Sequence, residues 1–207
     1  MNLEQKDIEF QKNLAKYLPK EFVNYTWTLL KESAVKFRIV APRKTKLGDF
    51  RAPIAEKTKP QITINGNLNP YAFLITTLHE VAHLNTYNRY KRSVKPHGQE
   101  WKYEFQQLLK PLISEEAFPT NLKRCLINSI KKTKASSCSD IDLSRELRKF
   151  DLSKTTIPLE SIPIGEDFKL NNKSFKKGKL RRTRYLCTEL HSGRAYLIHS
   201  LAEVNSL

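Results

Sequence analysis

The chain has 207 residues, of which 39% are hydrophobic and 28% charged, and this balance is typical of a folded globular protein. Its 37 Lys and Arg residues outweigh 21 Asp and Glu residues to give a net charge of +16, which favours a polyanionic partner such as nucleic acid over a merely soluble basic surface. Three cysteines without a C-x-x-C pair argue against a disulfide framework, and the lack of an apolar leader or long apolar run predicts a cytoplasmic protein without membrane contact.

The N-terminal part predicts helices packed around short strands. Apolar residues at helical spacing indicate helices over 3–18 and 22–30, the first stopped by a proline. Alternation of apolar and polar residues predicts strands over 35–39 and 61–65. A basic turn over 43–48 lies between them.

A long buried helix is predicted next. Asn69 is a favourable N-cap and Pro70 a favourable first helical residue, so a helix begins here and extends to about residue 90. It is apolar nearly all round as far as Leu84, which is typical of a helix in the middle of a domain.

This helix carries the H-E-x-x-H motif, from His79 through Glu80 to His83. Residues four apart lie on one helix face, so both imidazoles can bind one metal ion. Glu80 projects to the side, within reach of a water on that metal rather than of the metal itself. This layout is that of a zinc-activated water with a general base, which is hydrolase chemistry.

A catalytic zinc site needs three protein ligands and an open position, and His97 is the predicted third ligand. A second helix after Pro96 has an apolar stripe that begins with Trp101 and Phe105 and ends at Pro111. His97 is one turn before Trp101 and is expected to face the same buried side. The alternative is that these histidines are packed in the protein without a metal. The third histidine favours the zinc site, and the residues after His83 lack the glycine and histidine of the metzincin pattern.

Residues 116–155 are predicted to be a helical connector and 156–207 a small β module. The connector holds helices from 119 to about 130 and from 140 to 150, with a linker over 131–137 between them. In the module, prolines, an Asn-Asn pair and glycines separate short alternating runs, which is the pattern of β-hairpins.

The β module contains a basic segment flanked by the aromatic residues Phe175 and Tyr185. Basic side chains can contact phosphates and aromatic rings can stack on bases, so the segment is a candidate for binding nucleic acid without sequence preference. A plain solvated basic hairpin is an equally good interpretation. The candidate residues are Lys173, Lys176, Lys177, Lys179, Arg181, Arg182 and Arg184.

The motif pair resembles that of the SprT-like metallopeptidases, the family of Spartan-related proteins. His79-Glu80-Val81-Ala82-His83 is followed by His97-Gly98-Gln99-Glu100-Trp101, as in the family's H-E-x-x-H and later H-G-x-x-aromatic motifs. The upstream segments 46–51 and 62–65 also resemble the family's strands. The resemblance covers about residues 3–112. It departs from the family in the β module, where Cys187, His191 and His199 do not have the spacing of a four-cysteine zinc ribbon.

This resemblance implies an α+β, zincin-like (gluzincin) helical metallopeptidase domain with a small sheet over residues 1–115. It implies one zinc ion bound by His79, His83 and His97, with Glu80 as catalytic base, and cleavage of proteins on or near DNA, as in DNA–protein crosslink repair. The alternative is a non-catalytic nucleic-acid-binding protein with a structural or vestigial metal site. Retention of Glu80 favours the enzyme, because a structural site has no use for a base.

Overall fold

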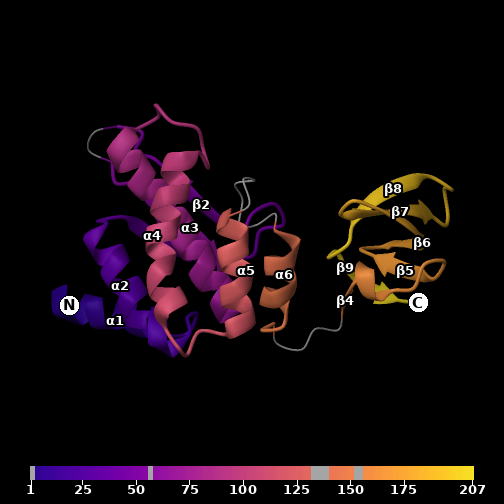
Figure 1. Ribbon diagram of the computed structural model, residues 1–207, viewed down its shortest axis with the longest axis horizontal. Coiled ribbons are helices and arrows are strands. Elements are labelled where there is room, and N and C mark those ends of the chain that lie inside the picture. Colours follow the sequence, from indigo (N-terminus) through magenta and orange to yellow (C-terminus); the bar gives the residue numbers. More distant parts are fainter. Residues whose placement is uncertain (1–2, 56–57, 132–139, 152–155) are drawn as a thin grey trace. The chain divides into compact units, whose positions relative to one another are not determined.

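The computed structural model of the chain describes residues 3–55, 58–131, 140–151 and 156–207. It divides into two compact units, Met1–Asp151 and Leu152–Leu207. Among the described residues, the first unit contains six α-helices and a three-stranded sheet and the second a six-stranded sheet, which confirms the predicted α+β class (Figure 1). No helix in these ranges has both the length and the hydropathy needed to cross a bilayer.

The sheet of the first unit is small and mixed. Its strands are β1 (Lys36–Val40), β2 (Gly48–Arg51) and β3 (Gln61–Asn65), in the order β1-β3-β2, with β1 parallel and β2 antiparallel to the central β3. Ile62 and Ile64 of β3 have no exposed surface. Because β2 is an edge strand of the described sheet, one row of its backbone groups has no neighbouring strand.

Two helices precede this sheet, α1 (Leu3–Leu14) and α2 (Val23–Glu32). α1 ends before the predicted limit at residue 18, and Leu18 lies in the following turn with 5% of its surface exposed. Pro19 disfavours helical backbone at Leu18, and before it Lys16 and Tyr17 form turns by donating to carbonyls three residues back.

The central helix is α3 (Pro70–Tyr90), which packs against β2 and β3. Its start is as predicted: the Asn69 side-chain oxygen accepts a hydrogen bond from the Ala72 N–H at 2.9 Å, and Pro70 follows at the first position. The Asn69 amide also donates to the Leu147 carbonyl and to Asp151, at 2.9 and 2.7 Å. Every residue from 72 to 82 is buried, so the prediction of a buried helix is confirmed.

α4 (Gln99–Ser114) runs alongside α3 and buries the predicted stripe of Trp101 and Phe105 (Figure 1). The predicted end at Pro111 is wrong, because the helix continues for three residues. Proline removes one backbone hydrogen bond, but Leu112 in this extension has no exposed surface, and its burial stabilises the last turn.

The segment predicted as a helical connector contributes to the core of the first unit. It forms α5 (Thr120–Lys131) and α6 (Ile141–Arg148), whose residues Leu122, Leu126 and Leu143 are at most 1% exposed in the same hydrophobic cluster as α3 and α4. The boundary between the units is therefore near residue 151 rather than 115. Most of the predicted linker, residues 132–137, lies outside the described residues.

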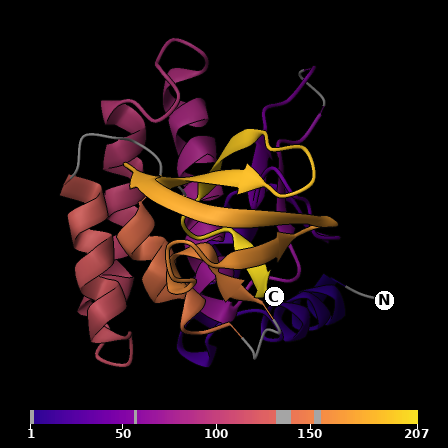
Figure 2. The same ribbon diagram turned by 90° about the vertical axis from the view of Figure 1, so that its right-hand side faces the viewer.

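The second unit is the predicted β module. Leu159, Phe168, Cys187 and Val204 have no exposed surface and form its core. Glycine is needed at position 178 in the strand Lys173–Arg181, because a Cβ there would collide with the backbone carbonyl of Leu186. Figure 2 shows its orange-to-yellow strands as a twisted antiparallel sheet. In sheet order, the strands are β4 (Ile157–Pro158), β9 (Glu203–Ser206), β5 (Asp167–Leu170), β6 (Lys173–Arg181), β7 (Arg184–Glu189) and β8 (Ala195–His199).

Candidate metal centre

Three histidine side chains meet on one side of α3, as predicted. The Nε2 atom of His83 lies 3.2 Å from that of His79 and 3.0 Å from that of His97, and the His79 and His97 Nε2 atoms are 3.1 Å apart. In the described part of the chain, this is the group of side chains whose ligand atoms are close enough together to hold a metal ion.

Hydrogen bonds alone cannot account for this triangle of nitrogens. Each neutral Nε2 is either a donor or an acceptor, so among three mutually adjacent atoms at least two have the same role and repel each other. A metal ion removes the conflict, because it accepts a lone pair from all three. Two nitrogens at about 2.0–2.1 Å from one tetrahedral ion lie about 3.3–3.4 Å apart, close to the observed separations. The three residues therefore fit a single metal ion.

His97 reaches α3 from a turn. The prediction placed it on the second helix, but α4 begins at Gln99, and the Gly98 N–H donates to the Lys95 carbonyl at 2.9 Å to close a turn before it. The backbone of His97 has φ +58°, in the left-handed region that few non-glycine residues adopt. Such strain persists where the surroundings fix it, and here it aims the imidazole at α3.

Aromatic packing fixes the orientation of the imidazoles. The Trp101 ring centroid lies 4.7 Å from those of both His79 and His97 and 5.4 Å from that of His83. Phe105 stacks on Trp101 at 4.9 Å, and Phe50 of β2 lies parallel to His83 at 6.4 Å. The ligand atoms are thus held in place by rings from β2 and α4, the elements on either side of α3.

Burial keeps the three histidines neutral. It lowers the pKa of His79 to about 3, with a further contribution from the charges of His83 and His97, and it lowers the pKa of His83 to about 4 in the same way. The pKa of His97 is also lowered by burial. At neutral pH each ring can therefore offer a lone pair to a metal without first losing a proton.

Glu80 is buried beside the triad, with 7% of its surface exposed. Its carboxylate packs against bare backbone at Gly48: a Cβ there would lie 2.6 Å from the Glu80 Oε1 atom. The pKa of Glu80 is raised to about 7, chiefly by burial and also by the charge of Asp49, while a hydrogen bond from the Phe50 N–H acts in the opposite direction. A carboxylate with a pKa near 7 is suited to proton transfer at neutral pH.

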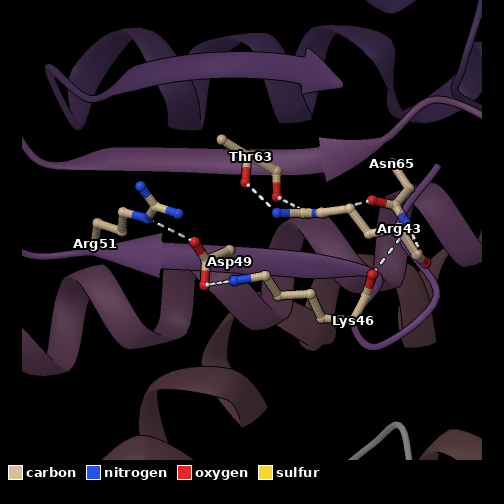
Figure 3. Close-up of polar contacts among 6 residues, drawn as sticks. All are labelled: Arg43, Lys46, Asp49, Arg51, Thr63 and Asn65. Atoms are coloured by element: carbon tan, nitrogen blue, oxygen red, sulfur yellow. Dashed lines mark hydrogen bonds and ion pairs between the residues drawn. The ribbon is translucent and has the colours of Figure 1, made fainter. Parts of the chain in front are cut away.

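A polar network fixes β2 in this position (Figure 3). The Arg43 side chain donates to Asn65 Oδ1 at 2.8 Å and to Thr63 Oγ1 at 3.0 Å, and the Asn65 amide donates to the Lys46 carbonyl at 2.9 Å. These bonds attach the basic turn before β2 to β3. Asp49 pairs on the same strand with Lys46 at 2.7 Å and with Arg51 at 2.8 Å, so its charge is shared between two cations.

Gly48 and Phe50 are the site residues that the sequence analysis missed. They are two apart on a strand and so face the same side, toward α3. A glycine at the start of a strand next to a basic turn, with an aromatic residue two positions later, is the signal that was available, because glycine in a strand often marks a close approach.

A cavity of about 340 Å³ opens beside the metal ligands. His83 and His97 line it, together with Tyr87, one of the two tyrosines near the motif. The other, Tyr90, is 39% exposed and does not line it. The cavity leaves room next to the triad for a water molecule or a substrate group.

The basic segment of the second unit is only partly available to a partner. Lys177 is 3% exposed, donates to the carbonyls of Glu160 and Ile162, and lies 3.8 Å from the centre of the Tyr185 ring. Phe175 is 4% exposed. A phosphate contact at Lys177 and base stacking on Phe175 were therefore wrong predictions, because both side chains are needed in the core of this unit.

The other candidates in this segment lie at the surface. Lys173 pairs with Glu189 at 2.7 Å and Lys176 with Asp167 at 3.5 Å. The remaining four are exposed around the turn between β6 and β7, and they are Lys179, Arg181, Arg182 and Arg184.

Comparison with known proteins gives no relative: no family model, no curated protein and no solved structure matches the chain.

Proposed function

We propose that the chain is a metal-dependent hydrolase, and more particularly a zinc peptidase of the SprT-like type with a zincin-like fold. The observation that carries the proposal is a buried carboxylate, Glu80, next to three neutral imidazoles and outside the set that could bind the ion. A structural metal site needs ligands alone, whereas a hydrolytic site also needs a base.

Zinc is the metal that this donor set favours. Three neutral imidazoles suit zinc among the common divalent ions, and the cavity beside them leaves a fourth position open. Zinc bound here would acidify a water molecule and polarise a substrate carbonyl.

The residues of the chain then have distinct roles in peptide cleavage. Glu80 accepts the proton of the attacking water and returns it to the leaving amine. His79, His83 and His97 hold the ion, and Trp101 keeps their rings oriented by packing against all three. Burial of Glu80 excludes competing water from the proton that it carries.

The edge strand β2 favours the proposal that the substrate is a polypeptide. It passes directly beside Glu80 and His83, and its outer row of backbone groups has no strand partner in the described sheet. An extended peptide can add to such an edge through main-chain hydrogen bonds, which would place its carbonyl groups along the site.

The net charge of +16 favours the proposal that cleavage takes place on or near DNA. Proteins bound or crosslinked to DNA are then the proposed substrates, as the resemblance to Spartan-related proteins implies. A non-catalytic nucleic-acid-binding role would explain the charge, but it gives no purpose to Glu80.

The test compares wild type, Glu80→Gln and His97→Ala at equal zinc. We expect about one zinc per wild-type chain and cleavage of a DNA-binding protein, assayed with and without DNA. Glu80→Gln should keep the zinc and lose cleavage by a factor of about 10²–10⁴, and His97→Ala should lose the zinc. Zinc binding without cleavage by the wild type would overturn the proposal, as would unchanged cleavage by Glu80→Gln.

A further inference from the structure

The cavity beside the metal ligands has walls of two kinds. Phe50, Val94 and Trp101 supply an apolar wall, and Lys91, Arg92 and Lys95, from the end of α3 and the turn that leads to His97, supply a basic one. The first wall is continuous with the metal centre, because Phe50 stacks on His83 and Trp101 contacts all three ligands.

The basic wall has an excess of positive charge. No carboxylate lines the cavity, and for Lys91, Arg92 and Lys95 there is no ion pair within the part of the chain that the structure describes. Three like charges around a small space repel one another, so an anionic occupant would relieve that repulsion.

Each of the aromatic rings Phe50, Tyr87 and Trp101 in the cavity already contacts a protein group. Trp101 is 3% exposed and lies between Phe105 and the imidazoles, Phe50 stacks on His83, and the Lys91 ammonium lies 5.2 Å from the centre of the Tyr87 ring. Binding of a single strand of nucleic acid generally uses free ring faces for stacking. The volume of about 340 Å³ suits one side chain with its flanking backbone.

We propose that this cavity is a specificity pocket that takes an acidic side chain, glutamate in particular, next to the cleaved bond. The methylene groups of glutamate contact the apolar wall, and its carboxylate lies among the cations of the basic wall. This rests on the proposed peptidase function, since the pocket selects among peptides only if the site cleaves them.

The first experiment is cleavage of a mixed peptide library by the zinc-loaded full chain, with the cleaved bonds identified by mass spectrometry. Glutamate should be enriched at one fixed position beside the cleaved bond. For a matched pair of peptides with Glu or Gln there, kcat/KM should favour Glu by about tenfold, and less at high salt. In Arg92→Gln/Lys95→Gln this ratio should fall to about two or less. The control Lys16→Gln/Lys20→Gln removes two exposed charges elsewhere and should keep the ratio.

A binding measurement separates the two proposals. The zinc-loaded Glu80→Gln variant is titrated with the fluorescent Glu and Gln peptides and followed by anisotropy. Cleavage without glutamate enrichment would overturn the pocket and leave the peptidase standing. Glutamate-dependent binding that needs Arg92 and Lys95, without cleavage of any peptide by the wild type, would keep the cavity as a glutamate-binding site and overturn the peptidase. If the double variant loses affinity for single-stranded DNA but keeps the glutamate preference, the basic wall contacts nucleic acid and the pocket proposal is wrong.

Discussion

Substitution of Gly48 by alanine should disable the proposed base while leaving the metal in place. A Cβ at this position would lie 2.6 Å from Glu80 Oε1, 2.8 Å from Glu80 Cγ and 2.8 Å from Thr76 Cγ2. Non-bonded carbon atoms are comfortable at about 3.5–4.0 Å, so the Glu80 side chain or β2 must move by close to 1 Å. The three atoms nearest to this Cβ belong to Glu80 and Thr76, so the added methyl group does not collide directly with a histidine.

The expected effect on catalysis follows from that displacement. A misplacement of about 1 Å in a reacting group can cost about a hundredfold in rate, so kcat should fall between tenfold and a hundredfold. The overpacked contact should also lower the free energy of unfolding by about 1–3 kcal/mol. Zinc affinity, measured by competition with a chromophoric chelator, should stay within about a factor of three of the wild-type value, because no ligand is changed.

The matched control is Gly66→Ala, at the end of β3. A Cβ there meets Ile39 Cγ2 at 3.0 Å and the Val40 carbonyl at 3.5 Å, so it is also tight, but it does not approach Glu80. Gly66→Ala should lose stability without losing kcat. In a double-mutant cycle, adding Gly48→Ala to Glu80→Gln should not lower kcat any further. Wild-type kcat in Gly48→Ala, or a parallel loss of zinc, would refute the packing argument.

Three further predictions concern pH, the core of the second unit and its surface. Between pH 7 and pH 5, metal-free Glu80→Gln should lose about 2 kcal/mol of unfolding free energy from each of His79 and His83. The folded pKa values of both lie below the unfolded value of 6.5, so the unfolded chain takes up protons first. An unfolding free energy in urea that does not change over this pH range would contradict the prediction. Lys177→Met should lower the free energy of unfolding by about 1–3 kcal/mol, because it leaves the carbonyls of Glu160 and Ile162 without this donor. An unchanged midpoint of thermal unfolding would refute the stabilising role of Lys177 in the core. Arg182→Gln should weaken single-stranded DNA binding and reduce its salt slope by about one, and unchanged titrations at several salt concentrations would exclude this contact.

The metal centre was predictable because its signals are local or follow from helix geometry. Asn69 and Pro70 define where α3 starts, and four-residue spacing places His79 and His83 on one face. His97 was predictable as a ligand by its residue type and distance along the chain. Its left-handed backbone was not, since that depends on a turn whose geometry is imposed by the surrounding fold.

The wrong predictions share a different cause, which is tertiary burial. Pro111 does not end α4, because Leu112 is buried against the core, and a basic pattern could not reveal that Lys177 lies inside the second unit. Leu122 and Leu143 belong to the core of the first unit although the boundary was expected before them. In each case the local pattern was interpreted correctly as polar or amphipathic, and contacts made by distant residues decided its place.

A metal ion held by the triangle of histidines would also be a crosslink. Thirteen residues separate His83 from His97, so an ion bound to both closes a chain loop that holds the entry of α4 against α3. Closing a loop of this length removes chain entropy worth about 3 kcal/mol from the unfolded state. The same loop carries Lys91, Arg92 and Lys95. Removal of the metal should therefore open this loop to proteolysis first and dismantle the wall of the cavity with it, so that metal occupancy and the shape of the cavity change together.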